Sequence, residues 1–409
     1  MIKKYGLLGL CMAFSLYTSA QLNVKQGHWH ASLQRKDGHH LPFEMDIQQK
    51  NGITTCYILN STERIKTEDP VYSGDSVLIK MPVFESYFKI KIINKDSLNG
   101  IWVTKGESKD IILPFAASAG EGRFPYRKTN NPKQVQGKWS IEFTRANKTK
   151  RPAIGEIVQK GSSLSGSVLT PAGDYRYLDG VVSGDSLFLS TFDGSHALLL
   201  TAKIKGDSLS GYFYAGQSGL ETWTAVKKAD VVLTPAVTAI KEDSDGKLDF
   251  TFKDLKGKPV SLQDERFKGK VVILQLMGSW CPNCMDETAF LSKYYLKNKD
   301  RGVEIIALAY ELSTDEERSK KSLQKFQTQF NVQYTMLNTG ATAGDPQRTE
   351  KTLPQLTAIK VFPTTIILDK NGKISDINTA FYGPGAGDYH LKYKENFEKK
   401  INNLLDQKL

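Results

Sequence analysis

An internal repeat in the first half of the chain constrains its fold more than any other feature of the sequence. Three short segments recur in the same order about 110 residues further along, and each matched pair shares a glycine. The matched segments are 26–29 with 136–139, 73–76 with 183–186, and 96–100 with 207–211. Three ordered matches indicate two copies of one structural unit rather than chance similarity.

Each copy consists of short alternating segments separated by turn residues. Residues 86–92 and 185–190 alternate apolar and polar side chains, which is typical of strands with one buried face. Turn signals such as Ser-Gly-Asp-Ser fall roughly every 8–12 residues, as in sandwiches and up-and-down barrels. We therefore predict two antiparallel barrel or sandwich units of about eight strands each, at residues 21–126 and 127–228. The pattern leaves open whether each copy closes alone or the two share sheets.

The first and second copies begin with Trp29 and Trp139 at matching positions. We expect both indole rings to fill the ends of their own cores, with a ligand cavity as the alternative. Cys56 lies in the strand-like run 53–59, where a lone cysteine is usually a small buried hydrophobic residue.

Four histidines, His28, His30, His39 and His40, gather around a predicted hairpin over residues 28–42. Neutral imidazoles in such an arrangement can bind zinc or copper. The second copy carries Lys138 and Ser140 in place of the first two, so the repeated fold does not depend on histidine there. We assign no metal to the hairpin and interpret it as an exposed polar turn.

The first twenty residues resemble a secretory signal. Lys3 and Lys4 precede an apolar stretch over residues 5–17, and small residues ending at Ala20 suit a signal peptidase. The apolar stretch is shorter than the roughly 20 residues that span a bilayer. Leu10 precedes Cys11, where a lipidation site would have a small residue. We expect cleavage after Ala20 and export, to the periplasm, where disulfides can form.

The charge of the chain is spread thinly along it. There are 55 Lys and Arg against 44 Asp and Glu, a net charge of +11, but no dense basic run. Nucleic-acid binding needs basic residues clustered on one face, so we predict no nucleic-acid partner.

The pattern changes after residue 228. A polar, proline-containing segment at 229–246 is typical of a linker, and residues 247–409 then alternate strand and helix, which predicts an α/β domain. The predicted strands are 248–255, 259–262, 270–276, 303–310 and 364–368, and the predicted helices are 283–297, 314–330 and 391–405. The run 270–276 is apolar throughout, as for a strand buried on both faces.

A Cys-x-x-Cys motif, Trp280-Cys281-Pro282-Asn283-Cys284, stands between the first buried strand and its helix. A cysteine at a helix N-terminus faces free backbone N–H groups, which favour its thiolate. We therefore predict that Cys281 attacks a disulfide and that Cys284, one turn inward, resolves the mixed disulfide by forming a disulfide with Cys281. A zinc site would need two more ligands, and the α/β region offers only His390.

Six segments of the α/β region are informative together: 250–252, 257–262, 269–272, 278–284, 361–365 and 368–374. On these segments, residues 247–409 resemble exported thiol–disulfide oxidoreductases of the TlpA/ResA type, which have a thioredoxin-like fold. The resemblance does not extend to the repeated half. The predicted fold is therefore multidomain, with all-β duplicated barrel or sandwich units followed by an α/β thioredoxin-like domain.

The resemblance implies further site residues. Pro363 is the expected cis-proline facing the disulfide, since a cis bond is cheap only before proline. The backbone of Phe362 can then pair with an extended substrate segment. We expect Trp280, Pro282, Phe362 and Thr364 to contact substrate.

Two positions depart from the ordinary thioredoxin pattern. Gln275 stands where thioredoxins resemble one another in having a buried aspartate, and glutamine cannot accept a proton. Glu287 follows Cys284 by one helical turn, where TlpA/ResA-type proteins have a functional acid. Glu287 is our candidate proton acceptor for Cys284, and a solvated first-turn acid is the alternative. The long separation of Cys281 from Pro363 predicts an elaboration over residues 311–358.

These features predict an exported thiol–disulfide oxidoreductase that acts on thiol- or disulfide-bearing proteins and needs no bound cofactor. The resemblance favours a reductase, as in cytochrome c maturation or thiol repair, supplied by a membrane electron donor. A thiol oxidase or isomerase is the alternative direction. A different hypothesis makes the β half a ligand- or partner-binding protein with a redox-regulated thioredoxin module. The sequence leaves the oligomeric state open.

Overall fold

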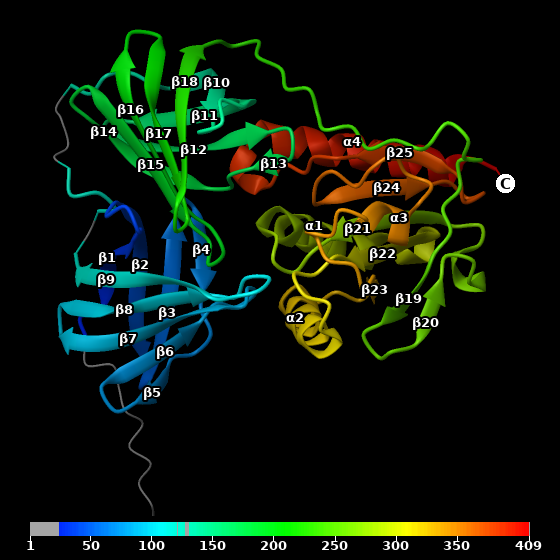
Figure 1. The fold of residues 1–409 in the computed structure, drawn as a ribbon, viewed down its shortest axis with the longest axis horizontal. Helices are drawn as coiled ribbons and strands as arrows, with labels where there is room; N and C mark the ends of the chain where they lie inside the picture. The colour runs from blue at the N-terminus through cyan, green and yellow to red at the C-terminus, as the bar shows by residue number, and fades with distance from the viewer. Residues whose placement is uncertain (1–23, 121, 127–130, 409) are drawn as a thin grey trace, which may run out of the picture.

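A computed structural model of the chain describes residues 24–120, 122–126 and 131–408, and the predicted signal segment with Cys11 lies outside these residues. Three β-sheets follow one another along the chain (Figure 1). The predicted fold class is confirmed: two antiparallel all-β units precede an α/β domain with helices packed on its sheet. In the described residues no helix is both long and apolar enough to cross a membrane.

The two β units have nine strands each, listed here in chain order. The first contains β1 (Gly27–Gln34), β2 (His40–Lys50), β3 (Ile53–Asn60), β4 (Glu63–Lys66), β5 (Val71–Ser73), β6 (Ser76–Lys80), β7 (Ser86–Asn94), β8 (Ser97–Thr104) and β9 (Ile111–Ala119). The second contains β10 (Gly137–Thr144), β11 (Lys150–Lys160), β12 (Ser163–Thr170), β13 (Gly173–Asp174), β14 (Leu178–Ser183), β15 (Ser186–Phe192), β16 (Ala197–Lys205), β17 (Ser208–Ala215) and β18 (Gly219–Lys227).

The matched sequence segments occupy equivalent places in the two units, and their glycines have a physical reason. Gly74 and Gly184 turn the chain between equivalent strands with φ of 62° and 61°, a left-handed conformation that favours glycine. Gly100 and Gly211 lie in β8 and β17, where a Cβ atom would collide with the backbone of the neighbouring strand.

The two units differ in closure. In the second, β11 pairs with β12 as well as with β10, and this pairing closes the sheet into a barrel with β13 outside the ring. In the first, β4 and β5 remain the two edges of an open sheet. The question that the sequence left open thus has an asymmetric answer, a closed barrel beside an open one.

Side chains on the outer surface of the closed barrel pack into the core of the open sheet. Phe192, at the end of β15, lies in the core of the first unit, with its ring centroid 4.5 Å from that of Phe43 and 5.5 Å from that of Trp102. Asn60, at the end of β3, donates from Nδ2 to the Phe192 carbonyl at 2.8 Å and accepts from the Phe192 N–H at 3.2 Å. The first unit therefore completes its core only against the second.

The expectations for the β half are met at three positions. Trp29 and Trp139 are buried, and each indole N–H donates to the carbonyl four residues earlier, at 2.9 and 2.8 Å. Cys56 is buried in the core of the first unit, and burial raises the pKa of its thiol to about 12.

The third sheet has the order β20-β19-β23-β22-β21-β24-β25. Its strands are β19 (Thr251–Asp254), β20 (Pro259–Ser261), β21 (Val271–Met277), β22 (Val303–Ala309), β23 (Thr335–Asn338), β24 (Thr364–Leu368) and β25 (Ile374–Asn378). The α-helices are α1 (Pro282–Asn298), α2 (Glu316–Gln329), α3 (Arg348–Thr352) and α4 (Asp388–Asp406), and short 3-10 turns lie at Glu265–Phe267, Lys299–Arg301 and Pro384–Ala386.

The central strand β21 is buried on both faces, as its apolar run predicts. Val271 and Ile273 pack with side chains of α1, α2 and α4, whereas Val272 and Leu274 pack with the segments 248–267 and 353–359. Because β21 runs parallel to β22, both strands end at the same edge of the sheet, and α1 begins there.

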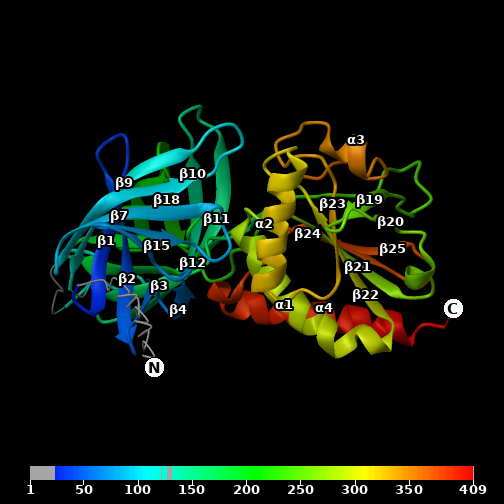
Figure 2. The same cartoon turned by 90° about the horizontal axis from the view of Figure 1, so that it is seen from below.

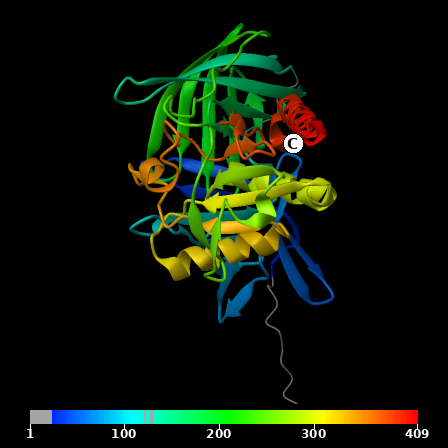
Figure 3. The same cartoon turned by 90° about the vertical axis from the view of Figure 1, so that its right-hand side faces the viewer.

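The α/β domain lies beside the β half, with α2 and the start of α1 toward it (Figure 2). In the view from the right-hand side of Figure 1, the α/β domain lies in front of the β half (Figure 3). The segment predicted as a linker follows the surface of the α/β domain. Ile240 forms a β-bridge with Leu356, and Lys247 forms one with Lys373. Val231 and Leu233 pack in a small apolar cluster that joins Ile154 and Leu169 of the barrel to the start of α4.

Candidate active site

The Cys-x-x-Cys motif lies where β21 gives way to α1. Cys281 is the N-cap of α1, and its Sγ accepts a hydrogen bond from the Cys284 N–H at 3.3 Å. Pro282 takes the first helical position, where its missing N–H costs nothing. Both cysteines are free thiols, with exposed fractions of 5% for Cys281 and 0% for Cys284. Burial raises the pKa of the Cys284 thiol well above its usual value.

Phe362 and Pro363 lie directly against Cys281. The Phe362-Pro363 peptide bond is cis, and the Cys281 Sγ is 3.6 Å from the Phe362 carbonyl oxygen, to which it donates. The Trp280 ring meets the Phe362 ring edge-on at 6.0 Å. Thr364 is fully buried in β24, and its hydroxyl donates to the Val361 carbonyl at 2.9 Å. The fold thus brings Phe362 and Pro363 next to the Cys-x-x-Cys motif. Thr364 lies beside them in the sequence but faces the interior.

Glu287 is a buried acid one helical turn after Cys284, so it is not the solvated acid that the sequence left as an alternative. Its carboxylate accepts from Gln275 Nε2 at 2.9 Å, from the Thr365 hydroxyl at 2.5 Å and from the Tyr393 hydroxyl at 3.2 Å. Burial raises the pKa of Glu287 to about 6, and the donated hydrogen bonds oppose that rise. Gln275 therefore serves as a donor that orients Glu287.

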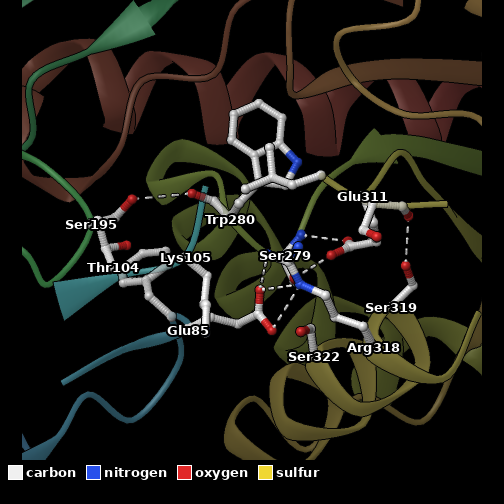
Figure 4. A pocket seen from close by; sticks show the side chains of 13 residues that line it. Glu85, Thr104, Lys105, Ser195, Ser279, Trp280, Glu311, Arg318, Ser319 and Ser322 are labelled. Atoms are coloured by element: carbon white, nitrogen blue, oxygen red, sulfur yellow. Dashed lines mark hydrogen bonds and ion pairs between the residues drawn. The ribbon is translucent and has the colours of Figure 1, made fainter. Parts of the chain in front are cut away.

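Glu311 is a buried acid that the sequence reasoning did not single out. It follows β22 and accepts from the backbone N–H of Ser279 at 2.8 Å and from the Ser279 hydroxyl at 2.6 Å, so it holds the loop before Cys281 (Figure 4). Burial raises the pKa of Glu311 to about 7. An acidic residue directly after a buried parallel strand, at the edge where such sheets place their sites, is the signal that could have identified it.

The β half contacts the motif itself. Ser195, in the loop between β15 and β16, points its hydroxyl at the Trp280 carbonyl at 3.4 Å (Figure 4). Val83 and Phe84, between β6 and β7, belong to the same buried apolar cluster as Cys281 and Cys284. The Ser195 hydroxyl and the Phe84 ring thus lie next to the Cys-x-x-Cys motif, although neither residue belongs to a recognisable motif.

Arg176 of the barrel reaches the first turn of α1. Its Nη1 donates to the Pro282 carbonyl at 3.2 Å and lies 3.0 Å from an Asp286 carboxylate oxygen, and its Nη2 pairs with Glu63 of the first unit. Burial raises the pKa of Asp286 to about 7, and the Arg176 guanidinium opposes that rise. Gly173 lies so close to Asn283 that a Cβ atom on the glycine would be 2.8 Å from the amide nitrogen.

His39 and His40 of the predicted histidine cluster contact different residues. The His39 ring lies 4.6 Å from the Tyr214 ring, centroid to centroid, at a tilt of 30°, and His40 Nδ1 lies 3.3 Å from the Ser32 hydroxyl. Within the part of the chain that the structure describes, no three His, Cys, Asp or Glu side chains are grouped to hold a metal ion.

Comparisons with known proteins found similarity to the α/β half of the chain. Residues 230–384 match the family model described as Redoxin. The thiol-disulfide oxidoreductase ResA of Bacillus thuringiensis subsp. konkukian is 32% identical over 126 residues, which is 31% of this chain and 62% of that protein. ResA of Geobacillus kaustophilus is 30% identical over 131 residues, 32% of this chain and 66% of that protein. The chain therefore matches less than two thirds of the length of these relatives.

Solved structures are also similar to part of the chain. A thioredoxin-family thiol:disulfide interchange protein from Chlorobium tepidum is 17% identical with a TM-score of 0.29, covering 42% of this chain and 99% of that one. A thiol-disulfide oxidoreductase from Bacteroides fragilis is 23% identical with a TM-score of 0.26, covering 36% of this chain and 96% of that one.

Proposed function

We propose that the chain is a thiol–disulfide oxidoreductase that acts on protein disulfides. The match of residues 230–384 to the Redoxin family model and the similarity of part of the chain to ResA support this proposal. The observation that carries this proposal is the placement of Cys281. Its sulfur caps the N-terminus of α1, where it accepts from the Cys284 N–H, and lies against the Phe362 carbonyl. A substrate strand that paired with that backbone would present its sulfur to Cys281.

The reaction proceeds in two displacements. The Cys281 thiolate attacks one sulfur of the substrate disulfide, which forms a mixed disulfide and releases the other substrate sulfur as a thiolate. The Cys284 thiol then loses its proton and attacks the Cys281 sulfur, which releases the second substrate thiolate and leaves a Cys281–Cys284 disulfide. The substrate gains two electrons and the dithiol loses two, so a donor must reduce the pair again.

Glu287 takes the proton of Cys284 in this mechanism. Its buried carboxylate lies one turn from a thiol whose own burial disfavours the thiolate. With a pKa of about 6, Glu287 is mostly ionised at pH 7 and still basic enough to act as a general base. Trp280, Pro282 and Phe362 form the side on which substrate binds, and Pro363 sets the position of the Phe362 carbonyl.

Glu287→Gln should slow the second displacement about 100-fold at pH 7 because a general base contributes roughly that much. In the wild type the rate of mixed-disulfide resolution should fall as the pH drops through 6, where Glu287 takes up a proton. The variant should lack that inflection. Stopped-flow tryptophan fluorescence between pH 5 and pH 8, with the exposed Glu317→Gln as the control, measures both. An inflection near pH 6 that survives in Glu287→Gln would rule out this role.

The same group makes stability depend on pH. The folded protein binds the Glu287 proton more tightly than the unfolded chain, since the pKa rises from 4.5 to about 6 on folding. Its contribution to stability is therefore largest below pH 4.5 and is lost as the pH rises through 6, by about 2 kcal/mol.

The reaction runs as a reduction outside the cytosol. The proposed signal over residues 1–20 directs export to the periplasm, and a membrane donor returns electrons to the Cys281–Cys284 pair. The central Pro-Asn dipeptide lacks the histidine that would stabilise a thiolate and make a strong oxidant. Cytochrome c maturation is the proposed setting. We also propose the domain boundaries 21–126, 127–228 and 247–409, with 229–246 as the linker.

The reduction potential of the Cys281–Cys284 couple tests the direction. We expect a value near −270 mV, as for thioredoxin, whereas a value near −120 mV would indicate a thiol oxidase. Equilibration with defined ratios of reduced and oxidised glutathione or dithiothreitol, followed by alkylation and mass measurement, gives the potential. A protein that neither reduces insulin disulfides nor forms the Cys281–Cys284 disulfide would contradict the proposed function itself.

A further inference from the structure

The face of the redox motif that a substrate must reach is occupied by the β half of the same chain. Cys281 is 5% exposed, and Pro282, between the two cysteines, is buried as well. The residues that lie over the motif form what we call the covering surface, which consists of Val83, Phe84, Gly173, Arg176 and Ser195.

The covering surface follows the motif residue by residue. Ser195 reaches the Trp280 carbonyl, Arg176 reaches the Pro282 carbonyl, and Gly173 packs against Asn283. The first two contacts are hydrogen bonds to backbone carbonyls of the motif, one from a hydroxyl and one from a guanidinium, and the third is a close approach of the Gly173 backbone to the Asn283 side chain. A docked protein segment would use contacts of the same kind on the same groups.

Ion pairs at the rim of the covering surface join it to α2 of the α/β domain. Glu85, next to Phe84, forms a bidentate pair with Arg318 of α2, in which Nη2 donates to Oε2 at 2.7 Å and Nε donates to Oε1 at 3.3 Å (Figure 4). Lys325 of α2 lies 2.8 Å from Glu68 and also donates to the Met81 carbonyl at 2.5 Å. At the centre, the buried Arg176 guanidinium pairs with Asp286 of α1.

The Arg176 pair matters most for seating the cover. Arg176 and Asp286 are both largely removed from water, with exposed side-chain fractions of 4% and 11%. Removing one partner of such a pair leaves the other buried without compensation, which is far more costly than losing an exposed pair. The closed arrangement should therefore be sensitive to Arg176 and only weakly sensitive to Glu85.

We propose that the β half binds the redox motif as an intramolecular competitor of substrate, so that a protein disulfide reaches Cys281 only when the covering surface has moved away. This proposal rests on the proposed function for its meaning, but the access it describes can be measured without turnover. The partner that displaces the cover is a protein segment that pairs with the Phe362 backbone and meets Trp280 and Pro282.

The connection between the halves permits such a movement. From the Ala236 carbonyl onward the linker is bonded to the α/β domain: Thr379 donates to the Ala236 carbonyl, and Lys241 N–H donates to the Gln355 carbonyl at 2.9 Å. The Ala236 N–H itself donates to the Pro171 carbonyl of the barrel at 3.5 Å. β18 ends at Lys227. Residues 229–235 lie between these bonds and the Lys228 N–H bond to the Lys138 carbonyl, so their backbone dihedrals would absorb the change, with Val231 and Leu233 leaving their apolar cluster.

The test is the alkylation of Cys281 by iodoacetamide in the reduced full-length protein, followed by mass spectrometry from pH 6 to pH 10. The midpoint of the pH profile reports thiol ionisation, and the plateau at high pH reports access. Arg176→Gln should raise the plateau rate at least about tenfold, because it breaks the buried pair that seats the cover. Arg176→Lys, which keeps the charge, should restore most of the protection.

Arg123→Gln is the matched control. Arg123 is also a buried arginine between two parts of the chain, but it donates to Leu59 and Ser190 within the β half. Its loss should leave the plateau rate of Cys281 unchanged. The proposal is overturned if both variants raise the plateau equally, or if wild-type Cys281 reacts as fast as it does in the same chain unfolded in urea.

A surface variant keeps the proposal testable if Arg176→Gln does not fold. Glu85→Arg places two cations together at the rim, where the side chains of Glu85 and Arg318 are 33% and 25% exposed, and should raise the plateau about twofold to threefold. Asp75→Arg, which opposes Lys91 within the first unit, is its control and should change nothing. Equal plateau rates for Glu85→Arg and wild type would overturn the proposal even if insulin reduction is normal. A protein with a protected Cys281 but no disulfide exchange would instead refute the proposed function.

Discussion

Cys281→Ser should reduce disulfide exchange by more than about 10³-fold, to the uncatalysed background, because a serine hydroxyl cannot form a disulfide. The substitution removes one sulfur at the N-cap of α1 and leaves a group that also accepts from the Cys284 N–H, so the fold should persist. Cys284→Ser should behave differently. Attack by Cys281 remains, but resolution does not, and the mixed disulfide should accumulate.

The turbidity assay for insulin reduction measures the first variant, and non-reducing electrophoresis of the substrate mixture detects the trapped complex of the second. Cys56→Ala is the control, since Cys56 is buried in the core of the first β unit, away from Cys281 and Cys284. We expect it to keep full exchange activity. Measurable insulin reduction by Cys281→Ser would contradict the assignment of Cys281 as the nucleophile.

Trp139→Ala should lower the free energy of unfolding of the barrel by about 3–5 kcal/mol, the range for removing a large buried aromatic side chain. The Trp139 ring is 1% exposed and its N–H bond to the Val135 carbonyl, 2.8 Å long, ties the start of the barrel to the segment before it. Because the closed barrel also supplies Phe192 to the first unit, the loss should destabilise both units.

Urea unfolding followed by circular dichroism measures the midpoint shift. Tyr212→Ala in the same barrel is the control, because the Tyr212 ring is 49% exposed and should cost under about 1 kcal/mol. If Trp139→Ala shifted the midpoint no more than Tyr212→Ala does, the tryptophan would not be part of the supporting core.

Local sequence patterns predicted most of the α/β domain. The helix expected over 283–297 is α1 at Pro282–Asn298, and the apolar run 270–276 is β21 at Val271–Met277. The short strands β23 and β25 and the helix α3 did not emerge from the pattern, because their four or five residues form no continuous apolar run like that of β24 and carry too little periodicity to be distinguished from a loop.

For the candidate site, the sequence identified the residues whose chemistry depends on near neighbours in the chain. Cys281 and Cys284 lie on one helical turn, and Glu287 lies on the next. It left undecided whether Glu287 is solvated, and the answer depends on Gln275, Thr365 and Tyr393, which come from other elements. Burial is a property of what packs against a residue, so spacing alone could not decide it.

The sequence by itself determined the repeated β unit and the placement of a dithiol at a helix N-terminus. The turn glycines require a left-handed backbone and the Cys-x-x-Cys spacing requires one helical turn, and both are local constraints. Only the tertiary structure decided that the second β unit closes into a barrel while the first remains open. It also decided that Arg176 donates to the carbonyl of Pro282, 106 residues further along the chain. Such contacts join surfaces that come from distant parts of the chain. Which surfaces meet depends on the burial and charge pairing of the assembled chain, which local sequence patterns do not reveal.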